Sequence, residues 1–175
     1  MLQLMRRGTT RERTEQLLDT IRKKVPGIAI RTTMITGHPN ETESDFNELF
    51  EFVKHSRFDR LGVFTYSHEE QTKSFDFEDN VPEAVKQERA DVIMSLQEEI
   101  SYEKNQSMIG SEMKVLIDRI EGSRTIGRTE YDSPEVDNEV IIDTTETYLK
   151  VGDFANISID DASAFDLYGR PTPKL

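Results

Sequence analysis

The residues best suited to contact a ligand lie in one turn. It joins an apolar stretch to a helix in residues 33–45, Thr-Met-Ile-Thr-Gly-His-Pro-Asn-Glu-Thr-Glu-Ser-Asp. Gly37 allows a ligand to approach the backbone closely, and Asn40 tolerates the left-handed conformation that such a turn needs. Thr42 and Asp45 form the capping box that begins the helix. Ligands in open α/β folds bind at the carboxyl ends of strands, so this turn is a candidate binding site. On spacing alone, an ordinary βα connection is the more common explanation.

The other residues that carry chemistry form no recognisable catalytic set. Adjacent acids such as Asp160 and Asp161 are expected by chance in a chain that is 32% charged, so they receive no acid or base role. His38, His55 and His68 lack the spacing of metal ligands on one element, and we expect them at the surface or in turns. The chain has no cysteine, which excludes disulfides, thiol nucleophiles and thiolate-held zinc or iron–sulfur groups within it.

The elements around the turn alternate between helix and strand. An amphipathic helix is predicted for residues 10–24, and a Pro-Gly pair follows it. Strands are predicted for residues 28–35 and 61–66, with a helix between them that begins after the capping box. This α-β-α-β succession predicts parallel strands joined by right-handed crossovers. Residues 67–80 are polar and form a loop whose two phenylalanines are expected to pack back onto the domain.

The second half of the chain has a different pattern. A long helix is predicted for about residues 82–108. From Glu112 onward apolar and polar residues alternate, which is the period of a strand. Five short strands fit a small closed antiparallel barrel of the size of an oligonucleotide-binding fold. The predicted strands are 112–118, 126–131, 139–143, 154–159 and 165–168.

These patterns predict two domains, an α/β domain followed by an all-β domain. The α/β domain comprises residues 1–105 and includes the long helix, the barrel comprises residues 106–170, and residues 171–175 form a tail.

Acidic residues dominate the charge of the chain, which is −12 overall. Residues 1–105 contain 15 Lys and Arg against 20 Asp and Glu, whereas residues 106–175 contain 7 against 14. RNA is usually bound by clustered Lys and Arg, so this barrel is not expected to bind RNA directly. A merely solubilising surface explains the acids equally well. No apolar run reaches the roughly 18 residues of a membrane-spanning helix, and we expect a cytoplasmic protein without membrane contact.

Three segments, in order, resemble one known family, the radical S-adenosylmethionine methylthiotransferases. Residues 35–42, Ile-Thr-Gly-His-Pro-Asn-Glu-Thr, resemble the family's Ile-Val-Gly-Phe-Pro-Gly-Glu-Thr signature. Met5, Arg7 and Thr10 match its Met-x-Arg-x-x-Thr element. Residues 57–72 resemble its next strand and loop, in the form typical of the branch that acts on a ribosomal protein. The resemblance extends over essentially the whole chain and ends in a β-domain of the kind called TRAM.

The resemblance implies a fold, a set of cofactors and their site. Residues 1–105 would be the C-terminal part of a partial parallel (β/α) barrel of the radical S-adenosylmethionine type. The cofactors would be S-adenosylmethionine and two [4Fe-4S] clusters, whose cysteine ligands lie before the point where this chain begins. The chain is therefore expected to be a C-terminal fragment of a larger enzyme, inactive without the N-terminal remainder. The residues carried over from the family pattern are Thr33, Ile35, Gly37 and Glu41 around the cofactor, Phe64 and Tyr66 beside it, and Arg7 facing the cofactor's carboxylate or the substrate.

Four residues depart from the family pattern and bear on the shape of the loops. His38, Asn40, His68 and Gln71 replace the usual Phe, Gly, Pro and Gly, respectively.

The resemblance also implies a reaction and a partner. This branch adds a methylthio group to the β-carbon of an aspartate in the twelfth small-subunit ribosomal protein. A 5′-deoxyadenosyl radical abstracts the substrate hydrogen, and an auxiliary cluster delivers the methylated sulfur. The basic ribosomal protein is the expected partner of the acidic barrel. The acids expected to bind it crowd one connection and are Glu130, Asp132, Glu135, Asp137 and Glu139.

Two alternatives stay open at this point. The chain could come from a tRNA adenosine methylthiotransferase whose barrel grips RNA, in which case the barrel should carry a basic face. It could instead be a non-enzymatic acidic module that binds proteins, in which case no cluster ligands should precede it in the longer gene product.

Overall fold

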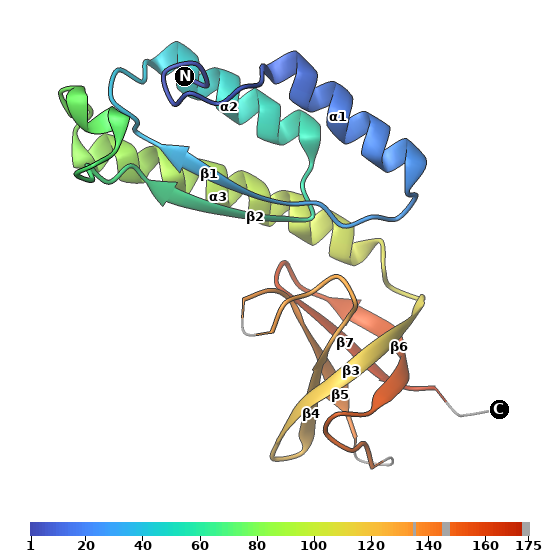
Figure 1. Cartoon of the computed structure of the whole chain (residues 1–175). Helices are drawn as coiled ribbons and strands as arrows, with labels where there is room; N and C mark the ends of the chain where they lie inside the picture. Colours follow the sequence, from blue (N-terminus) through green and yellow to red (C-terminus); the bar gives the residue numbers. More distant parts are fainter. Residues whose placement is uncertain (135, 145–147, 173–175) are drawn as a thin grey trace. The chain divides into compact units, whose positions relative to one another are not determined.

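The computed structural model describes all residues except 135, 145–147 and 173–175 (Figure 1). The chain forms two compact units, Met1–Ile100 and Ser101–Leu175, which we call the first unit and the barrel unit. The division falls within the long helix α3, Glu83–Gln106. The domain boundary expected at residue 105 lies near the end of the same helix.

The first unit has the predicted alternation of helices and strands. Strands β1 and β2 pair in parallel, with Arg31 opposite Arg60 and Thr36 opposite Thr65, so the parallel arrangement is confirmed. The polar loop after β2 contains one short 3-10 helix, η1. The elements are α1 Arg11–Lys24, β1 Arg31–Thr36, α2 Glu43–Ser56, β2 Arg60–Thr65, η1 Lys73–Asp76 and α3.

Local sequence signals set the ends of the helices. Thr10 is the N-cap of α1, and its hydroxyl accepts a hydrogen bond from the N–H of Arg13. Thr42 and Asp45 form the predicted capping box at the start of α2. The helix ends at Arg57, which adopts a left-handed conformation with φ of 46°. Asn40 also has a positive φ, as predicted for the turn.

The core of the first unit lies between the helices and one face of the β1–β2 pair. Its buried residues come from the three helices, from β2 and from the connection before β2, and Met34 and Val63 pack against them from the strands. The opposite face of the pair carries Ile35 and Phe64, which are 38% and 66% exposed. The buried set is Leu18, Phe46, Val53, Phe58, Leu61, Ile93 and Ile100. Two strands make up the sheet of this unit, and membership in a larger (β/α) barrel stays a prediction.

The barrel unit contains the five predicted strands, closed in the order β3-β4-β5-β7-β6. The expectation that all the strands are antiparallel is wrong for one pair, because β5 and β7 run in parallel. An odd number of strands cannot alternate in direction all the way round a closed barrel, so at least one neighbouring pair must be parallel. The strands are β3 Glu112–Glu121, β4 Arg124–Arg128, β5 Glu139–Asp143, β6 Phe154–Ala162 and β7 Asp166–Pro171.

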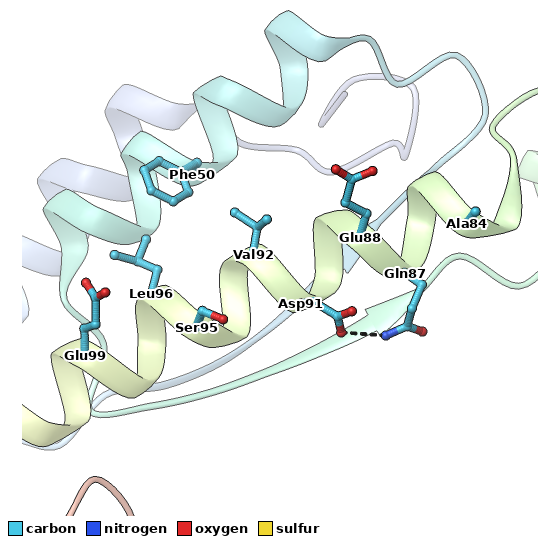
Figure 2. Close-up of a pocket in the computed structure, with 9 residues that line it drawn as sticks. All are labelled: Phe50, Ala84, Gln87, Glu88, Asp91, Val92, Ser95, Leu96 and Glu99. Carbon is cyan, nitrogen blue, oxygen red and sulfur yellow. Dashed lines mark hydrogen bonds between the residues drawn. The ribbon is translucent and has the colours of Figure 1, made fainter.

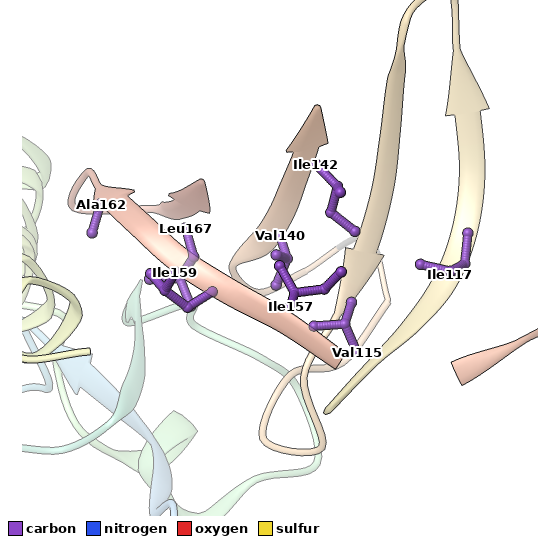
Figure 3. Packing of buried hydrophobic residues seen from close by; sticks show 8 residues of the cluster. All are labelled: Val115, Ile117, Val140, Ile142, Ile157, Ile159, Ala162 and Leu167. Atoms are coloured by element: carbon purple, nitrogen blue, oxygen red, sulfur yellow. The ribbon is translucent and has the colours of Figure 1, made fainter. Parts of the chain in front are cut away.

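Branched aliphatic side chains fill the interior of the barrel (Figure 3). Their period-two spacing on the strands points them to the same side. Gly127 is buried on β4 opposite Ile117 of β3, and a Cβ atom there would lie 2.5 Å from the carbonyl oxygen of Leu116. The cluster comprises Val115, Ile117, Val140, Ile142, Ile157, Ile159, Ala162 and Leu167.

The end of the chain differs from the predicted tail of residues 171–175. Pro171 is the last residue of β7 and pairs with Ile157, and the N–H of Thr172 donates to the carbonyl of Asn156 at 3.0 Å. The closing strand therefore extends further than its sequence pattern indicates, and residues 173–175 lie outside the described residues. In the described parts of the chain, no helix has the length and apolar character needed to cross a membrane.

Candidate functional site

The turn between β1 and α2 is held by a carboxylate within it. The N–H of Gly37 donates to Oε1 of Glu41 at 2.9 Å, and the N–H of Glu41 donates to the carbonyl of His38 at the same distance. Gly37 has a φ of 76°, a conformation that side chains with a Cβ rarely adopt. Gly37 and Glu41 therefore act together in shaping this turn.

A buried ion pair joins the turn to α3. Nη1 of Arg89 lies 2.8 Å from Oε1 of Glu41, and the two side chains are only 9% and 4% exposed. The same Nη1 atom donates to the carbonyl of Glu41, and Nη2 reaches Glu43 at 3.3 Å. The carboxylate of Glu41 is thus already engaged by the backbone of Gly37 and by an arginine. This arrangement gives it a positioning role at the site.

Lys86 occupies the space in front of Gly37. A Cβ atom built on Gly37 would overlap the aliphatic stem of Lys86, a side chain that is 3% exposed. Its ammonium contacts Asp79 at 2.7 Å, Glu83 at 3.4 Å and the carbonyl of Tyr66 at 3.5 Å. We expected glycine at position 37 because it allows close approach of a ligand. The structure gives another reason for glycine there, since the stem of Lys86 already fills the space that a side chain would take.

The charge state of Lys86 follows from its partners. Burial lowers the pKa of a lysine, but the hydrogen bond to Asp79 and the negative charges of Asp79 and Glu83 outweigh that effect. Together they raise the pKa of Lys86 above its ordinary value. A protonated lysine therefore links the end of β2 to the loop that follows it.

Two histidines pack against aromatic rings at the strand ends. His38 lies in the turn between β1 and α2, one of the two positions we expected for it, but it is buried there, with 1% of its surface exposed. Its Nδ1 lies 3.0 Å from the carbonyl oxygen of Pro39, and its Nε2 lies 3.0 Å from the hydroxyl of Ser74. Because a carbonyl oxygen only accepts hydrogen bonds, Nδ1 is the donor to Pro39. His38 thereby ties the loop after β2 to the turn.

Tyr66 lies at the centre of the aromatic group. Its ring centroid is 5.2 Å from that of His38, and its hydroxyl is 3.2 Å from Nδ1 of His68. The ring of His68 lies 4.5 Å from that of Phe75, and Phe77 lies 6.3 Å from His38. The contact with His38 confirms that Phe77 packs back onto the unit, whereas Phe75 is 40% exposed and packs against His68 of its own loop. Burial raises the pKa of Tyr66 above its ordinary value.

The remaining predicted cofactor residues lie on the exposed face of the two strands or near the N-terminus. Ile35 is the register partner of Phe64, and Thr33 lies two residues earlier on the same exposed face. Arg7 is exposed in the turn before α1, where its N–H donates to the carbonyl of Leu2 at 2.9 Å. The structure thus brings Ile35 and Phe64 together on one accessible apolar surface.

Sequence reasoning missed the two basic residues that fix the site. Lys86 and Arg89 are buried on α3, a helix on which we predicted no site residue. A signal was available, because both residues lie at helical spacing from Ile93, at i−7 and i−4 on the buried stripe. A charged residue on such a stripe indicates a buried partner.

Most of the acids expected to contact a substrate already have partners within the barrel. Asp132 is buried and accepts a hydrogen bond from the hydroxyl of Thr129 at 2.5 Å. Asp137 accepts from the N–H of Ser133 at 2.7 Å. Glu130 is exposed, and Glu135 lies outside the described residues.

Glu139 forms a two-pronged ion pair with Arg119 of β3. The guanidinium donates to the two carboxylate oxygens at 2.7 and 2.9 Å. The hydrogen bond and charge of Arg119 lower the pKa of Glu139 below its ordinary value, and Glu139 and Glu121 raise the pKa of Arg119. This pairing gives Glu139 a structural role in the barrel, and Glu130 is left as the exposed acid of the described set.

The residues present do not fit an iron–sulfur cluster. The chain contains no cysteine, and the described residues contain no group of three or more His, Asp or Glu side chains suited to a metal ion. Chemistry that requires a cluster is therefore not assigned to side chains of this chain.

Comparison with known proteins shows what the chain is similar to. Residues 109–171 match the family model of the TRAM domain. Over 97–98% of its length the chain is 61% identical to the ribosomal protein uS12 methylthiotransferase RimO of Cytophaga hutchinsonii and 58% identical to that of Christiangramia forsetii. The RimO protein of Flavobacterium psychrophilum is 54% identical over 98% of the chain. The chain spans only 38–40% of the length of these relatives. Over nearly all of its residues, the chain is thus similar to part of the ribosomal protein uS12 methylthiotransferases, in a region that includes a TRAM domain.

Proposed function

We propose that the chain is the C-terminal part of an enzyme that adds a methylthio group to an aspartate β-carbon of ribosomal protein uS12. The observation that carries this proposal is 61% identity over 97% of the chain to a relative named for that activity. The same match covers 39% of the relative, which leaves room for a cluster-binding part elsewhere in a longer protein. The absence of cysteine from these 175 residues also supports the proposal that the clusters are bound by another part of the longer protein.

In this proposal, the first unit belongs to the radical S-adenosylmethionine domain and helps to hold that cofactor. Ile35 and Phe64 offer an accessible apolar surface that suits the adenine ring. Glu41, through the N–H of Gly37 and the guanidinium of Arg89, fixes the turn at the end of β1. When bound in the longer protein, the cofactor and its clusters would supply the radical chemistry, and these residues would supply orientation.

The barrel unit would bind the substrate protein. Residues 106–175 hold 14 acids against 7 bases, which attracts a basic protein and repels phosphates. Among the predicted contact acids, Glu130 is exposed, whereas Glu139 is paired with Arg119. Glu130 and its neighbourhood are therefore the proposed contact point.

Titration of the 175-residue chain with ribosomal protein uS12 and with a tRNA, at low and moderate salt, tests the substrate class. We expect binding to the ribosomal protein that weakens with salt, because screening acts over about 10 Å at 0.1 M. Glu130→Gln should weaken this binding, whereas Glu139→Gln should act mainly on stability. Tighter binding to tRNA would contradict the proposal and favour an RNA-directed relative.

The reaction is tested with the longer protein after anaerobic reconstitution of its clusters. Incubation with S-adenosylmethionine and uS12 should increase the mass of one aspartate-containing peptide by a methylthio group. The 175-residue chain treated in the same way should leave uS12 unchanged, because it contains no thiolate to hold a cluster. Modification of uS12 by the 175-residue chain alone would contradict the proposal that another part of the longer protein binds the clusters.

A further inference from the structure

A groove lies between α2 and α3 in the surface of the first unit (Figure 2). Its volume is about 620 Å³, and its apolar walls are Phe50 of α2 and Ala84, Val92 and Leu96 of α3. Val92 is 38% exposed, and Phe50 and Leu96 are half-buried. An accessible apolar surface bounded by polar side chains is typical of a site that binds another molecule.

The charged residues that line the groove are all acidic. Glu88, Asp91 and Glu99 are exposed on α3. The amide of Gln87 donates to Oδ1 of Asp91 at 2.8 Å, which orients that carboxylate (Figure 2). Glu88 and Glu99 are 11 positions apart in the sequence, or about 16 Å along a helix, with Val92 and Leu96 between them. The groove therefore presents an apolar middle with a carboxylate toward each end.

The acidic and apolar character of the groove indicates which class of molecule can bind in it. Nucleic acid and anionic lipid would be repelled by the carboxylates. A second copy of the chain would bring the same three acids against this face, in a chain with a net charge of −12. A cationic amphipathic peptide satisfies both parts, because its apolar side chains can enter between the helices while its basic groups reach the acids.

We propose that the groove between α2 and α3 binds a segment of a partner protein that carries apolar side chains at helical spacing and Lys or Arg about three helical turns apart. The site is separate from the exposed face of β1 and β2 and from the acidic connection of the barrel. It does not depend on the proposed function.

A synthetic peptide of Leu and Lys, about 14 residues long and amphipathic as a helix, is a suitable probe. Its binding to the 175-residue chain is measured by fluorescence anisotropy. One control peptide replaces every Lys with Glu, and a second keeps the Lys residues and replaces every Leu with Gln. We expect the amphipathic cationic peptide to bind at least about tenfold more tightly than either control, since both the charge and the apolar face contribute.

Variants of the chain locate the binding. Val92→Ser and the double variant Glu88→Lys/Glu99→Lys should each weaken peptide binding at least about tenfold. The matched controls are Leu17→Ser, at an α1 residue that is 57% exposed, and Glu70→Lys/Glu78→Lys, at exposed positions of the loop after β2. These controls should change the affinity less than about twofold. Far-UV circular dichroism and the unfolding midpoint establish that each variant is folded.

Three outcomes would overturn the proposal. Equal affinity for the amphipathic peptide and the Leu-to-Gln peptide would show attraction to an acidic chain without use of the groove. An equal loss of affinity in the groove variants and their matched controls would place the binding elsewhere. Concentration-dependent dimerisation that Val92→Ser abolishes would make a second copy the occupant. Because neither Glu130 nor uS12 enters these measurements, failure here is distinguishable from failure of the proposed function.

Discussion

Two physical constraints favour glycine at position 37, the backbone conformation and the space around it. Its φ of 76° lies in the left-handed region, and the stem of Lys86 fills the space that a side chain would take. Two other glycines separate these effects, because Gly27 has a φ of 80° with open space around it and Gly8 has neither constraint. The three positions therefore form a natural series.

Replacing each of these glycines with alanine should give graded losses of stability. Gly8→Ala should change the free energy of unfolding by less than about 0.5 kcal/mol. Gly27→Ala should cost about 1–2 kcal/mol through backbone strain, and Gly37→Ala about 2–4 kcal/mol because overlap with Lys86 is added. Urea unfolding monitored by circular dichroism gives these values. An equal effect at Gly27 and Gly37 would show that Lys86 moves aside without cost.

The buried ion pair between Glu41 and Arg89 is expected to contribute to the stability of the first unit. Arg89→Met should destabilise the first unit by about 3–5 kcal/mol, because it leaves the carboxylate of Glu41 buried without its charged partner. The double variant Glu41→Gln/Arg89→Met should cost less than the sum of the single variants, since it removes both charges. Unfolding free energies of the three variants complete the cycle. Additive losses would mean that the two side chains act independently.

Helix α2 begins with a hydrogen-bond network that is sensitive to pH. The hydroxyl and the N–H of Thr42 donate to Oδ2 of Asp45 at 2.6 and 3.0 Å. These bonds lower the pKa of Asp45 below its ordinary value of 3.8. A carboxylate with a lowered pKa in the folded state stabilises the fold above its ordinary pKa, and this contribution is lost as the pH falls through the lowered value.

Thr42→Ala should therefore cost about 1 kcal/mol of stability at neutral pH and less in acid. The difference in unfolding free energy between the two proteins should narrow as the pH falls from 3.8 through the lowered pKa of Asp45, where this carboxylate becomes protonated in the folded protein. Denaturant unfolding at a series of pH values measures this narrowing. Ser44→Ala, at an exposed position of the same helix turn, is a matched control that should show no such trend. A difference that is constant with pH would show that the charge of Asp45 does not contribute.

Elements that depend on nearby residues were predictable from the sequence. The capping box, the left-handed Asn40 and the five barrel strands follow from short spacings and turn residues. The partners of Gly37 and Glu41 were not predictable in the same way, because Lys86 and Arg89 lie on a distant helix. Their place on its buried stripe indicates burial but does not say which residues they contact. The parallel β5–β7 pair was missed because it follows from closure of the whole barrel, which no single strand encodes.

At the scale of the whole molecule, the division into two units falls between residues 100 and 101, inside α3. The last turns of this helix belong to the barrel unit through side-chain hydrogen bonds. Ser101 donates to the carbonyl of Ala164 at 2.6 Å, Asn105 donates to that of Ser163 at 2.9 Å, and Asn138 donates to Asn105 at 3.2 Å. The first two bonds connect the helix to the turn between β6 and β7, and the third connects it to the residue before β5.

A fragment of residues 101–175 should therefore be more stable than one of residues 109–175, although the TRAM family match begins at 109. We expect a difference of about 1–3 kcal/mol, because removal of the helix end leaves buried polar groups of the turn without their partners. Chemical unfolding of the two fragments measures the difference. Asn105→Ala in the longer fragment should reproduce part of the loss. Equal stability of the two fragments would show that water satisfies the polar groups of the turn as well as the helix side chains do.

Closure of the barrel also governs how quickly the barrel can form. Strands β3 and β4 meet through a short turn at Gly122, whereas Leu116 and Phe154 at the β3–β6 pair are 38 positions apart, further than the 27 positions between Glu139 and Asp166 at the β5–β7 pair. Bringing distant segments together loses chain entropy before any contact compensates for it, so such pairings slow folding. The pairing of β3 with β6 is therefore expected to limit the refolding rate of this domain. The pairing that closes the ring of described strands thus also makes the barrel a slow folder for its size.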